Sequence, residues 1–192
     1  MLKSLIEQGA YIDSLGVGDN IAASNERVGG VYKLVAVEKD DVIIPKIKVS
    51  NDTIKTINPA YKKLYRFYDK ETGYALGDVL ALHDEAIPLH QYTLINPVDE
   101  WKTTTITNYN LRELQVPIFI DGRQVYELPN IHLRKQYCTQ QFETIYPEIK
   151  RSSNPHEYYV DLTKKLLELK KELILKSREK QTEIGKQYIK ER

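Results

Sequence analysis

The stretch YIDSLGVG, residues 11–18, gives the first indication of how the chain folds. Residues 11–14 predict a short strand, and Gly16, Val17 and Gly18 follow it as a loop. Two glycines one residue apart let the backbone turn sharply and bring its N–H groups close to an anion, because no Cβ stands in the way. The stretch therefore predicts a strand that ends in a phosphate-binding loop.

A short helix is predicted directly before this strand. Leu2, Leu5 and Ile6 recur at helical spacing, and Gly9 is placed to cap the helix at its carboxyl end. Helix, strand and glycine loop together form one α/β unit, which cannot make a sheet by itself. We therefore expect the chain to begin in the middle of a domain. A tight turn that requires a positive φ is the alternative explanation of the two glycines.

Composition excludes several classes of protein. The chain has 28 basic and 27 acidic residues, so no strong field attracts nucleic acid or an anionic membrane. Its one cysteine, Cys138, cannot form an internal disulfide and suits a reducing compartment. No apolar run approaches the roughly 18 residues of a membrane span, and the amino terminus does not resemble a signal peptide. These features predict a soluble, cytoplasmic protein.

Between residues 29 and 130 the apolar residues alternate with a period of two, which is typical of strands. Three hairpins are predicted: residues 31–37 with 42–49, residues 64–68 with 74–82, and residues 116–120 with 123–128. The last pair flanks Asp121-Gly122, a strong hairpin signal. Pro45 should place its strand at a sheet edge. This segment is expected to be antiparallel and to bury the following side chains: Val31, Leu34, Val35, Val37, Ile118 and Phe119.

After Pro129 the apolar period becomes helical. Cys138, Phe142, Ile145 and Ile149 form one stripe, in which Pro147 should break the last turn. A second stripe follows Asp161, which is expected to be the N-cap of the last helix; its members are Leu162, Leu166, Leu169 and Leu173. The predicted fold class is α+β, with one α/β unit and its glycine loop in residues 1–28, a hairpin-rich segment in 29–130 and a helical segment in 131–192.

No catalytic or metal-binding constellation follows from the residue spacing. The four histidines, His83, His90, His132 and His156, never fall four residues apart on a predicted helix. Cys138 lies on an apolar stripe, so it is expected to be a small buried residue instead of a nucleophile. We therefore predict no catalytic residue and no metal ligand, and the only candidate site is the glycine loop.

Five stretches of the chain are similar to the carboxyl-terminal portion of bacterial nicotinate phosphoribosyltransferase. They occur in the family's order, and the glycine loop and the strand VYKLVAV carry most of the resemblance. The stretches are LIEQGAYIDSLGVG (5–18), GGVYKLVAVE (29–38), YDKETGYALGDVLAL (68–82), VPIFIDGRQVYELP (116–129) and NPHEYYVDLTKKL (154–166).

The resemblance implies an enzyme that makes nicotinate mononucleotide from nicotinate and phosphoribosyl pyrophosphate with ATP hydrolysis, in the salvage route to NAD. It implies an irregular β/α barrel whose last unit lies in residues 1–28. The loop Gly16, Val17, Gly18 and Asp19 would then hold the 5′-phosphate of the ribosyl donor. ATP and Mg²⁺ are implied for the complete enzyme and are expected not to bind to this chain alone.

The chain departs from the family pattern in two ways that bear on the implied phosphate site and on the implied activity. The family often has threonine after the second glycine, where this chain has Asp19, a carboxylate that would repel a phosphate. The family's phosphorylated histidine and nicotinate-binding residues would lie upstream of Met1. We therefore expect an incomplete enzyme that needs the missing amino-terminal part or a second subunit. The alternative is a non-catalytic interaction subunit that binds a partner through Leu2, Leu5, Ile6 and Ile12; nucleic acid and membranes are not expected partners.

Overall fold

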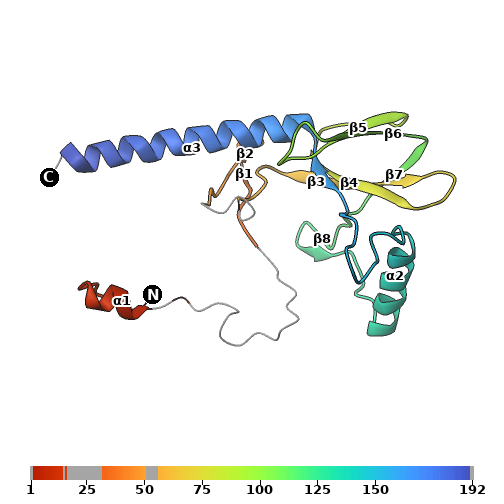
Figure 1. The fold of residues 1–192 in the computed structure, drawn as a ribbon, viewed down its shortest axis with the longest axis horizontal. Helices are drawn as coiled ribbons and strands as arrows, with labels where there is room; N and C mark the ends of the chain where they lie inside the picture. Colours follow the sequence, from red (N-terminus) through yellow and green to blue (C-terminus); the bar gives the residue numbers. More distant parts are fainter. Residues whose placement is uncertain (1, 15, 17–31, 51–55, 191–192) are drawn as a thin grey trace. The chain divides into compact units, whose positions relative to one another are not determined.

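The computed structural model describes residues 2–14, 16, 32–50 and 56–190 (Figure 1). Contacts divide the chain into two units, Met1–Lys33 and Leu34–Arg192. The described part is a mixed α/β fold with several small sheets and three helices. Most of the secondary structure, and all of the described core, belongs to the second unit.

The first unit contains α1, Leu2–Glu7, which confirms the predicted helix. Gly9 has φ 81° and donates its N–H to Ile6, while Ala10 donates to the carbonyl of Leu5. This pair of bonds is a Schellman motif, in which the left-handed residue is usually glycine. The strand predicted over residues 11–14 does not form. A strand needs a neighbour for its N–H and C=O groups, and none is present in the described part of this unit.

The second unit begins with a hairpin of β1, Ala36–Lys39, and β2, Val42–Pro45. Asp40 and Asp41, with φ 52° and 60°, form the two-residue turn, so the predicted hairpin is confirmed but its strands are shorter than expected. Pro45 lies at the end of a two-stranded sheet, which is the edge position expected for it. The carbonyl of Val35 accepts N–H groups from Lys46 and Ala60, which connects the hairpin to the chain that leads into the main sheet.

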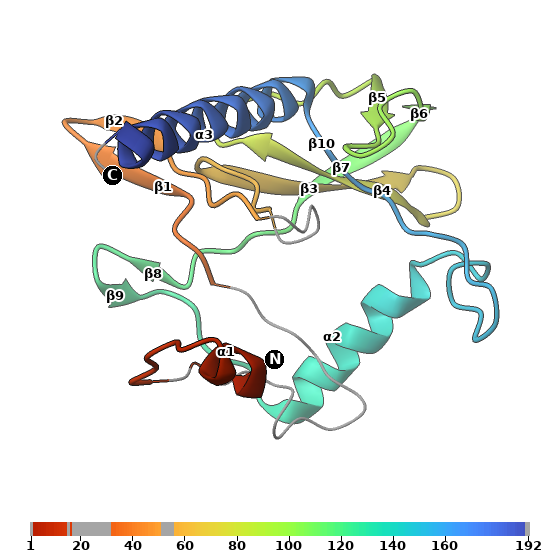
Figure 2. The same cartoon turned by 60° about the vertical axis from the view of Figure 1, so that its left-hand side comes forward.

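A four-stranded sheet in the order β10-β4-β3-β7 organises the second unit (Figure 2). β3, Lys62–Asp69, and β4, Ala75–Leu82, form the predicted hairpin around Gly73, whose φ is 73°. β7, Tyr109–Glu113, pairs with the other edge of β3. The described strand pairs within residues 29–130 are all antiparallel, as expected. β10, Val160–Leu162, adds to β4 in parallel and comes from the segment that was expected to be helical.

The core lies on one face of this sheet, under the hairpin of β5, Gln91–Ile95, and β6, Thr103–Thr107. Phe67 on β3 is fully buried and packs against Tyr92 and Tyr109, with ring centroids 5.1 and 4.8 Å apart. The other buried members of this cluster are Val79, Ala81, Ile87, Leu94 and Ile106. The core therefore forms where β5 and β6 cross the sheet, and periodicity had not predicted these two strands.

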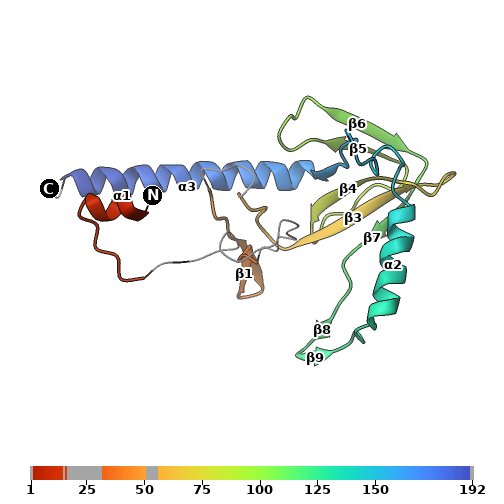
Figure 3. The ribbon, with the colours of Figure 1, turned by 60° about the horizontal axis from the view of Figure 1, so that its bottom comes forward.

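The predicted burial of the first and last hairpins is wrong. β8, Phe119–Ile120, and β9, Arg123–Gln124, form the expected tight turn with φ 48° at Asp121 and 74° at Gly122. Phe119 is nevertheless 64% exposed, because the small β8–β9 sheet pairs with no other strand (Figure 3). Among the other expected core residues Leu34 and Val37 are exposed, Val35 and Ile118 are half-buried, and Val31 lies outside the described residues.

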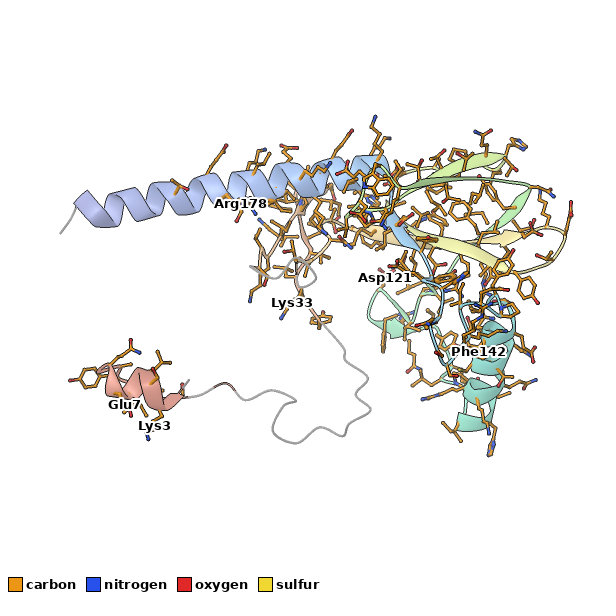
Figure 4. All side chains as sticks on the ribbon, in the orientation of Figure 1. Lys3, Glu7, Lys33, Asp121, Phe142 and Arg178 are labelled. Carbon is orange, nitrogen blue, oxygen red and sulfur yellow. The ribbon has the colours of Figure 1, made fainter. Side chains whose placement is uncertain are left out.

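Helix α2, Ile131–Glu143, begins at Asn130, whose side chain accepts the N–H of Leu133 at 3.1 Å. It ends before Pro147, as expected. No residue of α2 is buried, and Cys138 is exposed, so its expected burial is wrong. Phe142, also on α2, is 58% exposed (Figure 4), whereas Ile145 and Ile149 beyond the helix are half-buried. The helix reaches the sheet through polar bonds instead, from Arg112 to the Tyr137 hydroxyl and from Tyr68 to Gln141.

The last helix, α3, Lys164–Lys190, follows directly on β10. Thr163 caps it: its hydroxyl accepts the N–H of Leu166, and its carbonyl accepts that of Leu167. Asp161 is therefore not the N-cap, because parallel pairing with β4 keeps the chain extended through Leu162. Leu162, Leu166 and Leu167 bury the start of the helix against Leu80, Leu82 and Ile95 of the sheet region.

Candidate functional site

The predicted phosphate loop is described only at its first residue. Gly16 is exposed, and no atom of the described chain lies within 4 Å of a Cβ placed on it. Val17, Gly18 and Asp19 lie outside the described residues. The convergence of the three N–H groups stays a prediction.

A cluster of three polar side chains, the buried Asp78 and the half-buried Arg66 and Tyr158, joins β3, β4 and the segment before β10. Arg66 donates to both carboxylate oxygens of Asp78, Nε to Oδ1 at 2.7 Å and a terminal nitrogen to Oδ2 at 2.9 Å. The Tyr158 hydroxyl donates to the same Oδ1 at 2.7 Å. The Arg66 guanidinium also lies 5.4 Å from the centre of the Tyr158 ring. Asp78 is only 4% exposed, so three short bonds compensate its loss of hydration.

The pKa values of two members indicate that the Arg66–Asp78–Tyr158 cluster stabilises the fold and does not take part in proton transfer. The hydrogen bond to Asp78 raises the pKa of Arg66 above its ordinary value. Burial, followed by the hydrogen bond to Asp78, raises the pKa of the Tyr158 hydroxyl. Arg66 therefore stays cationic and Tyr158 stays a neutral donor across the neutral range. Neither group is suited to exchange a proton with a substrate.

An open groove of about 530 Å³ lies beside this cluster. Its walls come from the start of β4 and from residues 146–159, so its parts are distant in sequence and periodicity could not reveal it. The chain is held there by main-chain bonds from Ala75 to Thr144 and from His156 to Glu148. The groove offers aromatic rings and carboxylates from Tyr146, Glu148, Glu157, Tyr158 and Tyr159.

A second buried carboxylate belongs to Asp161 on β10, which is 3% exposed. Burial, and to a smaller extent the charge of Glu157, raises the pKa of Asp161 to about 6. From the sequence alone, Asp161 is expected to cap a helix because it precedes a helical stripe. A buried acid in the short strand VDL has no periodic signature that could have identified it.

The histidines and the cysteine lie apart from one another. His83 stacks on Tyr61 with ring centroids 4.9 Å apart. Cys138 is an exposed free thiol on α2. Within the described ranges no three His, Cys, Asp or Glu side chains gather as a metal site would require. None of the described helices is both long and apolar enough to cross a bilayer.

The model of the nicotinate phosphoribosyltransferase C-terminal domain family matches residues 61–170, from the start of β3 into α3. Two relatives are similar over most of the chain, and both are called nicotinate phosphoribosyltransferase. The Bacillus subtilis (strain 168) protein is 34% identical over 165 residues, which is 84% of this chain and 34% of the relative. The Caenorhabditis elegans protein is 30% identical over 170 residues, 86% of this chain and 29% of the relative.

The fold also resembles a solved structure. The crystal structure of human nicotinic acid phosphoribosyltransferase superimposes with a TM-score of 0.54 over 60% of this chain and 23% of the human chain, at 23% identity. The chain spans about a third of the length of the curated relatives it matches.

Proposed function

Because the chain belongs to the nicotinate phosphoribosyltransferase C-terminal domain family, we propose that it is the carboxyl-terminal part of such an enzyme. The complete enzyme would join nicotinate to phosphoribosyl pyrophosphate, release pyrophosphate and form nicotinate mononucleotide, with ATP hydrolysis. The family match over residues 61–170 carries this proposal, and the similarity to the Bacillus subtilis enzyme supports it over more of the chain. A single free thiol, Cys138, fits work in the reducing cytoplasm.

The three segments would contribute differently. Residues 1–28 would complete a barrel and supply the phosphate loop, residues 29–130 would form the hairpin-rich support, and residues 131–192 would close the domain with helices. The missing strand over residues 11–14 is consistent with a barrel edge that pairs only when neighbouring strands are present. ATP and Mg²⁺ would act on the complete enzyme, and we expect residues 1–192 alone to bind neither.

The glycine loop would act by positioning and electrostatics. N–H groups of Gly16, Val17 and Gly18 would donate to the 5′-phosphate of the ribosyl donor. Hydrogen bonds to a charged acceptor are roughly twice as strong as neutral ones, and main-chain donors need no side-chain ordering. Fixing the phosphate would hold the ribosyl carbon near nicotinate while pyrophosphate departs.

We expect residues 1–192 alone to form no nicotinate mononucleotide. The chain covers only about a third of each relative, so most of the enzyme's residues lie outside it. Within the Arg66–Asp78–Tyr158 cluster, neither Arg66 nor Tyr158 is suited to proton transfer at neutral pH. Chromatographic detection of the mononucleotide would test this, with the amino-terminal part of the Bacillus subtilis enzyme added in a parallel reaction. Turnover by residues 1–192 alone would contradict the proposed division of labour.

We expect Gly18→Val to abolish binding of phosphoribosyl pyrophosphate by the assembled enzyme, because a branched side chain would block close approach of the phosphate. Asp19→Thr should tighten binding if the carboxylate repels the donor. Lys186→Ala, distant in sequence, serves as the control and should change nothing. Isothermal titration of the assembled enzyme with the donor measures all three. Unchanged binding by Gly18→Val would remove the loop from the site, and weaker binding by Asp19→Thr would give the carboxylate a positive role.

A non-catalytic interaction subunit is the second candidate. The exposed apolar side chains of the first unit favour it: Leu5 is 42%, Ile6 58% and Ile12 38% exposed. Apolar side chains gathered on one short segment are commonly covered by another protein surface. Here we expect the occupant to be the amino-terminal part of the enzyme. If residues 1–192 bind the amino-terminal part but the mixture forms no more nicotinate mononucleotide than the amino-terminal part alone, the interaction subunit is favoured over the enzyme.

A further inference from the structure

A hollow of about 300 Å³ lies between β10 and the β5–β6 hairpin, on the core side of the sheet. Its residues come from three places in the chain: the end of β5, the loop into β6, and β10 with the residue before it. The side chains that matter for the argument are Asn96, Trp101, Thr103, Thr104, Tyr159 and Asp161.

Asp161 is the buried acid of this hollow. It pairs with Val79 in the parallel β10–β4 ladder, so its side chain lies on the sheet face that β5 and β6 cover. The residue is only 3% exposed, and its carboxylate accepts no hydrogen bond from the residues that the structure describes. Since no fully buried side-chain oxygen of those residues lacks a partner, the carboxylate oxygens of Asp161 keep some contact with the open hollow. Buried carboxylates are normally paired or hydrogen-bonded. The raised pKa, about 6, still leaves most of this group ionised at neutral pH.

At the mouth of the hollow the ammonium group of a lysine lies beside an aromatic ring. Trp101 is 79% exposed, and the Lys102 ammonium lies 5.2 Å from the centre of its indole. Lys102 also pairs with Asp99 at 2.5 Å, so its charge is compensated locally and does not neutralise Asp161. Glu157 adds a further negative charge near the acid. Lys102 lines the hollow too, and its pKa is raised first by Asp99 and to a smaller extent by Glu157. The hollow therefore combines an exposed indole with the Asp161 carboxylate, which forms no ion pair with Lys102 or another described cation.

We propose that this hollow binds a small planar aromatic cation that carries paired N–H donors, such as an amidinium or a protonated amino-heterocycle. Two parallel N–H groups would bond both oxygens of Asp161, and the ring would stack on Trp101. Thr103 and Thr104 both line the hollow. As neighbours on β6 their side chains face opposite sides, and Thr104, paired with the buried Leu94, is the one on the core side that can orient a further polar group. The proposal does not depend on the proposed transferase function, because the glycine loop belongs to the other unit.

The chain is well suited to a direct test because Trp101 is its only tryptophan. The indole N–H resonance of ¹⁵N-labelled residues 1–192 would be followed during titration with benzamidine, with its neutral counterpart benzamide and with benzoate. We expect benzamidine to shift this resonance saturably, benzamide to bind at least about tenfold more weakly because it lacks the positive charge, and benzoate not to bind.

Asp161→Asn keeps the shape of the side chain and removes its charge, so we expect it to weaken benzamidine binding at least about tenfold. Asp84→Asn, at an exposed acid outside the hollow, should leave the affinity unchanged. Far-UV circular dichroism of each variant would confirm folding. If the unchanged protein binds benzamide as tightly as benzamidine, the proposal is wrong. The proposal is also wrong if a folded Asp161→Asn protein binds benzamidine within twofold of the unchanged protein. It is wrong as well if benzamidine does not shift the Trp101 resonance.

Discussion

Replacing Asp78 by alanine is expected to lower the free energy of unfolding by about 3–5 kcal/mol, the range for removal of one partner from a buried ion pair. The change would leave the guanidinium of Arg66, whose side chain is only 17% exposed, without a counter-ion. It would also leave the Tyr158 hydroxyl without its acceptor. Urea unfolding followed by far-UV circular dichroism measures the loss.

Two control variants separate the buried pair from ordinary polar contacts. Tyr158→Phe removes one neutral donor and should cost about 1–3 kcal/mol, less than Asp78→Ala. Lys63→Ala breaks the half-exposed pair with Glu113 on neighbouring strands and should cost at most about 1 kcal/mol. The double variant Arg66→Ala, Asp78→Ala should cost less than the sum of the two single changes, because neither charge is then left alone. A loss below 1 kcal/mol for Asp78→Ala would show that water reaches the cluster.

Phe67→Ala is expected to destabilise the second unit by a similar amount, about 3–5 kcal/mol. The ring is fully buried between two tyrosines, so truncation removes apolar contacts and leaves a cavity that the flanking strands cannot close. Phe67→Leu keeps much of the volume and should cost about 1.5 kcal/mol or less. The same urea titrations measure both changes.

Phe119→Ala is the matched control for Phe67→Ala. The same atoms are deleted from a ring that is 64% exposed, so the expected change is within about 0.5 kcal/mol. Both phenylalanines occupy strands of predicted hairpins, but alternation predicted burial only for Phe119. Equal losses at the two sites would mean that the β8–β9 hairpin is as well packed as the main sheet.

The turns were the best predicted part of this fold, because turn chemistry is local. Gly73 and Gly122 take positive φ values where the sequence placed them, and Gly9 ends α1 as a Schellman residue. A glycine relieves the steric cost of a positive φ regardless of what packs around it. Asp40 and Asp41 form their turn for a related reason, since short polar side chains tolerate the left-handed region.

The core and the two buried acids could not be predicted in the same way. β5 and β6 have the sequences QYTLI and TTTIT, where threonine replaces most of the apolar alternation. Their position over Phe67 depends on pairing across the sheet. Asp78 and Tyr158 are 80 residues apart, so no window of local sequence contains both. Asp161 resembles a helix cap until β4 supplies the parallel neighbour that keeps it in a strand.

The sequence by itself determined the family, the positions of the hairpin turns and the start of the helical segment at Pro129, because these depend on short motifs and on backbone preferences. Only the tertiary structure decided which side chains are buried. A hydrophobic residue leaves water only if another surface covers it, and Phe119, Cys138 and Phe142 have no such cover in the described chain. The same structure buried Asp78 and Asp161, where a parallel strand and a crossing hairpin closed over polar positions that local patterns assign to the surface.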